Sequence, residues 1–272
     1  MLEPWQIRLY RRSIKKKETV RAVLRHLPPL DGKRCLEIGC ATGTSSWMLR
    51  QRGGRWVSTD FEVSQAESAH DLLEDDVILI DARGLPFPDH AFDVLVGINF
   101  LENLHDDIGF VREMVRVLKP GGHFLLTCPD RKTKRLGFQL KRLYGLTAES
   151  GGYGHVRDGY SRSELDNIIR AAGLELEHIG SYSRFFTEVV ENSLNYVYHR
   201  SAGKRNNDGH APSFHGSTSP STRREFDAVD NEFRTYSVFY PVLRGVSLLD
   251  RLIPFTEGYM YCLRARKPEV CG

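Results

Sequence analysis

The stretch Cys35-Leu36-Glu37-Ile38-Gly39-Cys40-Ala41-Thr42-Gly43-Thr44 decides the fold. An apolar run ends at an acidic residue and continues into a turn with two glycines, after which a helical pattern begins. Glycine lets the backbone turn sharply and approach a ligand, and the first N–H groups of a helix have no partners within the helix. The stretch therefore predicts a strand, a ligand-binding loop and the start of a helix.

The glycine spacing in this loop differs from that of dinucleotide-binding folds. Gly39 and Gly43 are separated by Cys-Ala-Thr, which does not match the pattern G-x-G-x-x-G. The spacing disfavours a NAD-dependent oxidoreductase.

Polar residues end three further apolar runs that look like strands. Residues 56–60 end at Asp60, residues 77–81 end at Asp81, and residues 92–99 end at Asn99. In an open parallel sheet such ends meet at the carboxyl edge, where ligands bind. One carboxylate there can accept the two hydroxyls of a ribose and a second can accept the amine of an adenine, so the pattern predicts an adenosine-containing ligand.

With this loop and these strand ends, the chain resembles the class I S-adenosylmethionine-dependent methyltransferases, in particular the type 11 subfamily, over roughly residues 33–180. Residues 37–43 resemble the nucleotide loop, Asp60 is similar to the ribose-binding acid, and Asp81-Ala82 resembles the adenine-side segment. Further matches are Leu85-Pro86-Phe87-Pro88-Asp89 with Phe92-Asp93, Val117-Leu118-Lys119-Pro120-Gly121-Gly122 before the fifth strand, and His155-Val156-Arg157 with Tyr160-Ser161 and Glu164-Leu165 beside the substrate pocket.

The resemblance implies an α/β fold of the Rossmann-like methyltransferase type. Its sheet is mostly parallel and seven-stranded, with helices on both faces and an antiparallel last strand. The implied cofactor is S-adenosylmethionine, with S-adenosylhomocysteine as product. The residues that the resemblance places against it are Glu37, Gly39, Cys40, Ala41, Gly43, Asp60, Phe61, Asp81, Ala82 and Asn99.

Two departures from the family pattern matter. Ala41 stands where the loop commonly has its central glycine, which adds one methyl group near the ligand. Asn103 follows Glu102 where the family often has histidine, and His105 lies two residues further on. No role of the family histidine is therefore transferred to this chain.

His155 is the predicted general base. It follows Gly151-Gly152-Tyr153-Gly154 after the fifth strand, and the ordinary pKa of histidine suits proton transfer near neutral pH. The alternative is that His155 and Arg157 only anchor the turn before the next helix. His105 is a second candidate, with the alternative role of a polar helix start.

Composition sets the class of protein. The 272 residues are 40% apolar and 27% charged, as in a globular α/β domain with an elaboration, and the net charge of +3 does not indicate a nucleic-acid partner. The five cysteines show no metal-binding spacing, so no metal is predicted and a reduced, cytoplasmic protein is expected. We expect neither a cleaved signal nor a membrane-spanning helix.

The predicted organisation has four parts. They are an amphipathic N-terminal helix at 1–30, the cofactor-binding core at 31–180, an insertion or lid at 181–255 with a mobile segment near 201–222, and the last strand at 256–272. Within them we predict helices to about residue 27 and over 44–51, 107–118 and 162–172, the last begun by a Ser161-x-x-Glu164 capping box. Strands are expected over 174–179 and 259–266.

Two basic segments bear on which acceptor the protein binds. The N-terminus from Arg8 to Arg25 and the segment 131–144 both alternate cations with apolar residues. Each is either a solvated helix face or a contact for an anionic, amphipathic acceptor or membrane surface. The apolar stretch 233–255 is interpreted as added core, a homodimer face or a substrate lid.

The leading interpretation is methyl transfer to the oxygen or carbon of a small-molecule or lipid-like acceptor. An RNA-directed methyltransferase is the alternative, but the chain lacks the Asn/Asp-Pro-Pro-aromatic motif after its fourth strand and an aromatic-studded basic module, so nucleic acid is disfavoured. A cofactor-binding protein without catalysis is a third interpretation, because fold alone does not fix chemistry.

Overall fold

The computed structural model describes residues 3–75, 77–131, 139, 142–144, 156–205 and 220–269. For residues 195 and 197–205 it describes the backbone alone.

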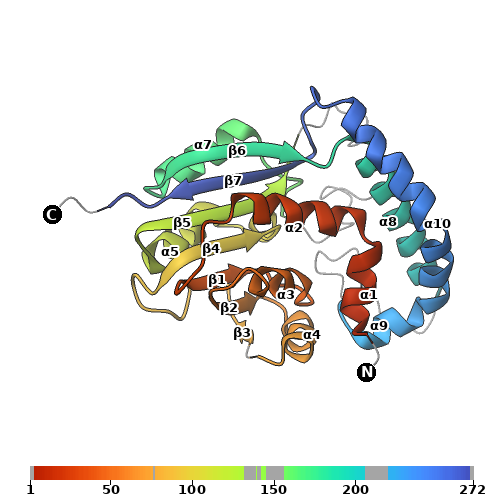
Figure 1. The fold of residues 1–272 in the computed structure, drawn as a ribbon, viewed down its shortest axis with the longest axis horizontal. Coiled ribbons are helices and arrows are strands. Elements are labelled where there is room, and N and C mark those ends of the chain that lie inside the picture. Colours follow the sequence, from red (N-terminus) through yellow and green to blue (C-terminus); the bar gives the residue numbers. More distant parts are fainter. Residues whose placement is uncertain are drawn as a thin grey trace.

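Seven strands form one sheet in the order β3-β2-β1-β4-β5-β7-β6 (Figure 1). Strands β1 to β5 are mutually parallel, whereas β7 is antiparallel to both of its neighbours. This arrangement confirms the predicted fold class, including the antiparallel last strand. The strand bounds are β1 Arg34–Ile38, β2 Arg55–Asp60, β3 Val77–Leu79, β4 Phe92–Ile98, β5 Leu118–Pro129, β6 Glu175–Tyr182 and β7 Met260–Arg266.

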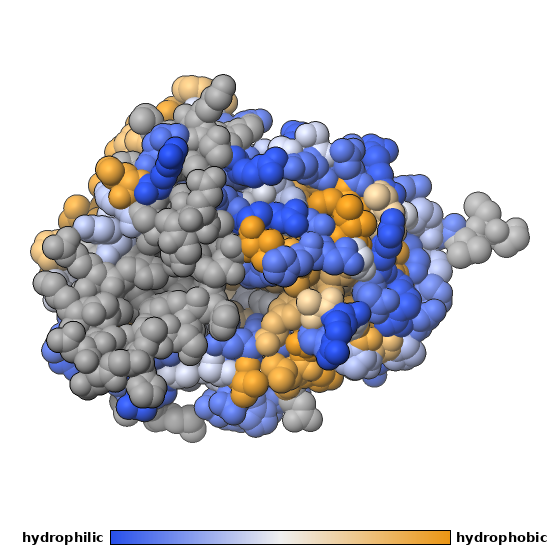
Figure 2. Space-filling view, turned by 180° about the vertical axis from the view of Figure 1, so that it is seen from behind, coloured by the Kyte–Doolittle hydropathy of each residue, from blue (hydrophilic) through white to orange (hydrophobic). Residues whose placement is uncertain are grey.

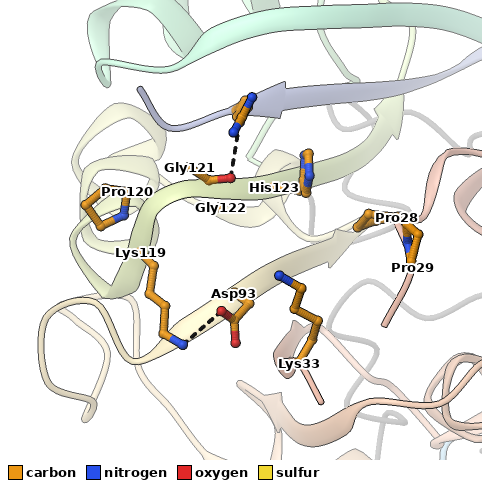
Figure 3. A pocket seen from close by; sticks show the side chains of 10 residues that line it. Pro28, Pro29, Lys33, Asp93, Lys119, Pro120, Gly121, Gly122 and His123 are labelled. Atoms are coloured by element: carbon orange, nitrogen blue, oxygen red, sulfur yellow. Dashed lines mark hydrogen bonds and ion pairs between the residues drawn. The ribbon is translucent and has the colours of Figure 1, made fainter. Parts of the chain in front are cut away.

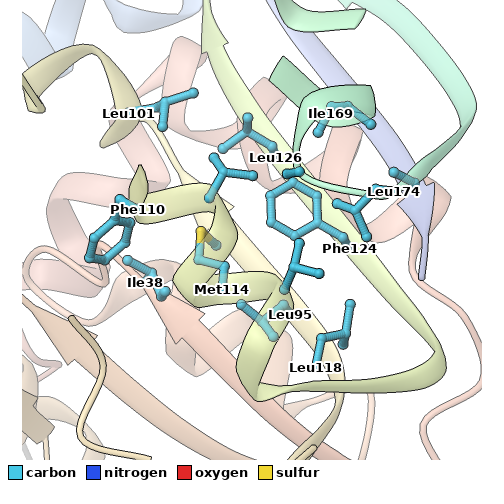
Figure 4. Packing of buried hydrophobic residues seen from close by; sticks show 14 of the residues in the cluster. Ile38, Leu95, Leu101, Phe110, Met114, Leu118, Phe124, Leu126, Ile169 and Leu174 are labelled. Atoms are coloured by element: carbon cyan, nitrogen blue, oxygen red, sulfur yellow. The ribbon is translucent and has the colours of Figure 1, made fainter. Parts of the chain in front are cut away.

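Helices cover both faces of the sheet because successive strand residues point to opposite sides. On one face Cys35, Val94 and Leu125 pack against α2 (Ile14–His26) and α3 (Thr44–Arg50). On the other, the larger cluster joins β1, β4 and β5 to α5 (Asp107–Val117) and α7 (Arg162–Ala171), as Figure 4 shows. Helix α4 (Val63–Leu73) follows β2.

Two predicted helix boundaries are corrected. The expected single N-terminal helix is divided into α1 (Trp5–Arg12) and α2, because Ser13 has an extended backbone and its side chain accepts the N–H of Lys16 at 3.2 Å. The helix expected over 107–118 ends at Val117. Leu118 already begins β5, so Pro120-Gly121-Gly122 lies within the start of that strand rather than after the helix.

The capping box before α7 is confirmed. The Ser161 side chain accepts the N–H of Glu164, and the Glu164 carboxylate accepts the N–H of Ser161 at 2.7 Å. Two helix donors are thereby satisfied, which fixes where the chain turns from the strand-end region into α7.

Helices fill the long insertion between β6 and β7. They are α8 (Phe185–Arg205), α9 (Arg223–Ala228) and α10 (Asp230–Leu248), followed by the 3-10 turn η3 (Leu249–Leu252). In Figure 1 these helices and α1 lie beyond the carboxyl ends of the parallel strands. Ile14, Val190 and Tyr240 join α2, α8 and α10 in a small core of their own. Residues 206–219 of the predicted mobile segment lie outside the described residues.

In the part of the chain that the structure describes, none of the helices combines the length and apolar character needed to cross a membrane.

Candidate cofactor and acceptor site

The strand register brings the predicted polar ends to one edge of the sheet. Ile38 of β1 lies opposite Thr59 of β2 and Gly97 of β4, so the loop after β1 is flanked by Asp60 and Asn99. On the outer side the N–H of Ile80 donates to the carbonyl oxygen of Asp60 at 2.9 Å, which places Asp81 beside the end of β2. The predicted cofactor residues therefore share the carboxyl edge.

The loop after β1 is held by its backbone. The N–H groups of Gly39 and Cys40 both donate to the carbonyl oxygen of Thr59 at 3.0 Å. Gly39, Ala41 and Gly43 have φ values of 77°, 49° and 82°, in the left-handed region. A Cβ on Gly43 would lie 2.9 Å from Cα of Ala69 in α4. The second glycine is thus required by the close approach of a helix as well as by its backbone angle.

Asp60 fastens this loop to the end of β2. Its Oδ2 accepts the N–H of Ala41 at 2.8 Å, and its Oδ1 accepts those of Phe61 and Glu62 at 2.9 and 3.1 Å. Burial raises the pKa of the carboxyl group, against the lowering effect of these three donors. A carboxylate offers about four acceptor positions, so about one is left for a ligand hydroxyl.

Glu37 and Cys40 lie behind the loop rather than at its surface. Glu37 is fully buried, and its Oε2 accepts the hydroxyl of Ser46 and, at 3.1 Å, that of Ser58. Burial raises the pKa of Glu37 although the neighbouring serine hydroxyls lower it. Cys40 is 1% exposed, and burial raises the pKa of its thiol. These two residues can position the loop but do not offer polar atoms to the solvent-facing edge.

The remaining predicted residues are accessible. Asp81 and Ala82 are exposed, and the Asp81 carboxylate accepts Nε and Nη2 of Arg83 at 2.9 and 2.6 Å. That guanidinium lowers the pKa of Asp81. Asn99, at φ 48°, accepts the hydroxyl of Thr127 at 2.8 Å. Phe61 is half-buried, with its ring centroid 5.6 Å from that of Phe110.

These residues fit an adenosine-containing cofactor by their chemistry. Asp60 and Asp81 supply carboxylate acceptors, the ring of Phe61 supplies an apolar surface, and Ala41 is exposed at the turn. Carboxylates at the carboxyl edge of a parallel sheet are suited to a sugar diol and an aromatic amine.

Helix α1 links the strand-end region to the insertion. The side-chain amide of Gln6 donates to the carbonyl oxygen of Ser68 in α4 at 2.9 Å. The Trp5 ring lies 5.4 Å from that of Phe226 in α9, and the Arg8 guanidinium lies 5.4 Å from the same phenylalanine ring. One cation of the basic N-terminal segment, Arg8, thus packs against the insertion.

His155 lies outside the described residues, as do most of residues 131–144. Its neighbour Val156 is described, and the N–H of Val156 donates to the carbonyl oxygen of Glu102 at 3.1 Å. Glu102 belongs to η1 (Leu101–Asn103), which follows β4. The chain after residue 155 therefore lies beside the strand-end edge. His105, the second candidate, is exposed.

A buried polar cluster that sequence reasoning missed anchors this segment. The Tyr160 hydroxyl donates to Oδ2 of Asp107 and lies 3.0 Å from both that atom and the carbonyl oxygen of Leu101. Nη1 of Arg157 lies 2.7 Å from the same carboxylate oxygen. Tyr160 is 1% exposed, and burial raises the pKa of its hydroxyl. The partners are more than 45 residues apart in the sequence, so no local spacing could have revealed the cluster.

A cavity of about 370 Å³ lies at the opposite, amino edge of the sheet (Figure 3). Asp93 and Lys119 form an ion pair at 2.8 Å on its wall, and the Asp93 carboxylate also accepts the N–H of Arg34 at 2.9 Å. The Phe92-Asp93 and Leu118-Lys119 motifs are thus joined at the strand starts, where Phe92 pairs with Leu118. Their contacts are structural and distant from the carboxyl edge.

Within the described ranges, no group of three or more His, Cys, Asp or Glu side chains is placed to hold a metal ion. Cys35, Cys40, Cys128 and Cys262 are free and buried. Burial raises the pKa of Cys35 and of Cys262 to about 12, so both thiols stay protonated at neutral pH.

Comparison with known proteins agrees with this geometry. Residues 36–126 match the family model described as a methyltransferase domain. A probable S-adenosylmethionine-dependent methyltransferase of Mycolicibacterium smegmatis is 31% identical over 54% of this chain and 53% of its own length. A demethylmenaquinone methyltransferase of Clavibacter sepedonicus is 35% identical over 58% of this chain and 72% of its own length. A ubiquinone biosynthesis O-methyltransferase of Marinobacter nauticus is 28% identical over 62% and 72%.

This chain spans about half the length of the mycobacterial relative and nearly three quarters of the other two. The matched core contains the loop after β1 and the acidic ends of β2 and β3. The chain belongs to the class I S-adenosylmethionine-dependent methyltransferases of the type 11 subfamily, with S-adenosylmethionine as its cofactor.

Proposed function

We propose that this protein transfers a methyl group from S-adenosylmethionine to the oxygen or carbon of a small-molecule or lipid-like acceptor. The observation that carries the proposal is that buried Asp60, exposed Asp81 and half-buried Asn99 gather at the carboxyl edge of the sheet, within the region that matches the family model. The names of two relatives point to quinone acceptors, and one of them specifies transfer to oxygen.

In this proposal Asp60 accepts a ribose hydroxyl and Asp81 accepts the adenine amine. Phe61 and Ala82 line the base, and Asn99 with the backbone of Gly39 to Gly43 faces the amino-acid end. Asp81 must exchange part of its contact with Arg83 for the ligand. The exchange is feasible because both side chains are exposed, at 54% and 91%. Glu37 and Cys40 act through the loop that they support.

Bound S-adenosylmethionine supplies an electrophilic methyl group on a sulfonium leaving group. The chain then has to hold the acceptor atom in line and dry, so positioning is the main catalytic contribution. The contacts of Gln6 with α4 and of Trp5 with α9 support this role, because they hold α1 and the insertion next to the carboxyl edge of the sheet.

We infer that His155 takes the acceptor proton. Arg157 and Tyr160 account for anchoring the described part of the segment, which supports a separate task for His155. His155→Gln should lower the turnover of an acceptor with a weakly acidic hydroxyl by about 10²-fold. It should also remove the acidic limb of the kcat profile, the fall in kcat toward low pH that follows protonation of a histidine base, whose ordinary pKa is about 6.5. Unchanged kcat and pH profile would assign His155 to anchoring alone.

The decisive experiment offers the protein labelled S-adenosylmethionine and cell extract divided into lipid, polar-metabolite and RNA fractions. Mass spectrometry is expected to find the labelled methyl group in the lipid or polar fraction. Label in RNA would favour the RNA-directed alternative. Binding of S-adenosylhomocysteine without transfer in any fraction would favour the non-catalytic alternative.

The cytoplasm is the proposed location, because four buried free thiols fit a reducing compartment. A homodimer through the insertion is the competing use of its apolar surface, and the next experiment distinguishes it from membrane contact.

A further inference from the structure

The outer face of α10 and η3, defined here as the exposed residues between 234 and 255, is strongly apolar. Seven of the thirteen exposed large hydrophobic residues in the described part of the chain lie in this stretch. Val242, Leu252 and Phe255 are 66%, 72% and 83% exposed. Figure 2, seen from behind, shows apolar residues along the upper left rim, where α10 and η3 lie. An exposed apolar concentration of this kind marks an interaction surface.

The inner face of the same helix is fixed in place by polar contacts. The Tyr236 hydroxyl donates to the carbonyl oxygen of Arg12, and the Tyr240 hydroxyl accepts Nζ of Lys17 at 2.8 Å. The carboxylate of buried Asp250 accepts the N–H groups of Phe186 and Thr187, at 2.8 and 3.1 Å, at the start of α8. The apolar residues are therefore presented on a supported helix rather than on a loose segment.

The charges of the outer face have one sign. Residues 233–256 contain Arg234, Arg244 and Arg251, all exposed, and Asp250 is the sole acidic residue of that stretch. Asp250 is 7% exposed and faces α8. Arg234 is paired with Asp230 at 2.8 Å, so the positive charge of this face rests on Arg244 and Arg251. An exposed surface of valine, leucine and phenylalanine with these two arginines combines the two features that bind interfacial helices to anionic lipids.

We propose that the outer face of α10 and η3 lies on an anionic phospholipid surface, with its apolar side chains at the boundary of headgroups and acyl chains and its arginines among the phosphates. A second copy of the chain fits less well, because a two-fold interface places the same patch against itself. Arg244 and Arg251 of one copy would then face the same positive patch of the other, whose exposed residues include no carboxylate.

This docking is independent of methyl transfer, but it would bring the strand-end edge close to the membrane. Helices α8 and α10 lie beyond the carboxyl ends of the parallel strands in Figure 1. The proposed site and the lipid surface would then be neighbours, as a lipid-like acceptor requires.

The test is flotation of the full chain with vesicles of phosphatidylcholine alone or with added phosphatidylglycerol, at low and high salt. We expect binding to the anionic vesicles that weakens with salt. Each arginine near such a surface contributes roughly fivefold to partitioning, so Arg244→Glu with Arg251→Glu should reduce it by roughly 25-fold or more. Val242→Asp with Leu252→Asp should reduce binding at both salt concentrations, because it removes the apolar part.

Arg162→Glu is the matched control, since it reverses an exposed charge on α7, away from the outer face, and should leave binding within twofold. Circular dichroism verifies that each variant is folded. Equal binding of all variants, or absence of binding to anionic vesicles, overturns the proposal. Sedimentation provides the remaining outcome: a dimer that Val242→Asp with Leu252→Asp dissociates, without vesicle binding, would show that the face joins two copies.

Discussion

The carboxyl edge of the sheet and the outer face of α10 differ in the kind of side chain they present and in how those side chains are held. At the edge, polar side chains are held by partners far apart in the sequence, such as Asp60 with Ala41 and Thr127 with Asn99. On the outer face of α10, apolar side chains such as Val242 and Leu252 are exposed. The edge is built as a preorganised site, and the helix face as a contact surface.

The two regions also differ in what they share with relatives. The family model matches residues 36–126, which contain β2 to β4 and most of β1 and β5, whereas α8 to α10 lie outside it. We therefore propose that the reaction chemistry belongs to the shared sheet and that the choice of acceptor or partner belongs to the insertion. We expect substitutions at the carboxyl edge to change cofactor binding and stability, and substitutions on the insertion to change association with a membrane or partner.

The largest expected effect is at Asp60. Asp60→Ala should weaken the affinity for S-adenosylhomocysteine about 100-fold in calorimetric titration, because it removes a charged acceptor for the sugar and releases the Ala41 N–H that shapes the loop. Asp93→Ala is the control. It removes a carboxylate of the same kind from the amino edge of the sheet, where it binds Lys119, and should change this affinity less than threefold. Equal affinities for the wild type and Asp60→Ala would place the cofactor elsewhere.

Gly43 tests the packing of the edge. Gly43→Ala should lower the free energy of unfolding by about 3 kcal/mol, since a Cβ at φ 82° is strained and would lie 2.9 Å from Cα of Ala69. Gly53→Ala provides a control with the same backbone strain, because φ is 88° and nothing lies within 4 Å of the added carbon. It should cost about 1 kcal/mol. Urea unfolding measures both, and equal losses would show that backbone strain alone requires Gly43.

The pH dependence of stability that Glu18 of α2 contributes tests how the insertion is joined to the core. Burial, with Asp250, Glu188 and Glu191 of the insertion facing it and Arg21 opposing them, raises its pKa to about 7 from an ordinary 4.5. The native protein therefore holds a proton that the unfolded chain loses, so this contribution to stability is complete below pH 4.5 and is lost as the pH rises through 7.

Glu18→Gln keeps the neutral form at every pH. Relative to the wild type, it should gain about 2 kcal/mol of unfolding free energy between pH 5 and pH 8, measured in urea at each pH. Glu67→Gln, at an exposed site on α4, should show no such gain. Parallel pH profiles for Glu18→Gln and the wild type would contradict the raised pKa.

The sequence predicted the fold and the strand-end residues because both depend on local patterns. Apolar runs ending in Asp60, Asp81 and Asn99 reveal strand ends, and the topology of a parallel sheet then brings them together. The Ser161 to Glu164 capping box was equally readable, since its two partners are three residues apart. The break at Ser13 was missed because the apolar pattern continues across it.

Contacts between distant residues could not be predicted in this way. The cluster of Tyr160 with Asp107 and the use of Asp93 and Lys119 as a structural pair depend on three-dimensional proximity that spacing does not encode. The family resemblance places Glu37 among the residues against the cofactor, without indicating how deeply it is buried. The structure shows that it is fully buried against serine hydroxyls behind the loop.

The smallest expected effect is at Ala41, where this chain departs from the family pattern. Its φ of 49° is unfavourable for a residue with a Cβ, and the hydrogen bond to Asp60 holds it there. Ala41→Gly should raise the free energy of unfolding by about 0.5 kcal/mol, because the relief of strain exceeds the entropy lost by a more flexible unfolded chain. Ala41 is exposed, so no cavity opens.

Ala41→Val should act in the opposite direction by about 1 kcal/mol or more, since a branched side chain is least tolerated in this region. Urea unfolding of the two variants checks the order, and a Val variant as stable as the Gly variant would show that the loop relaxes out of the left-handed conformation and that Asp60 does not hold it.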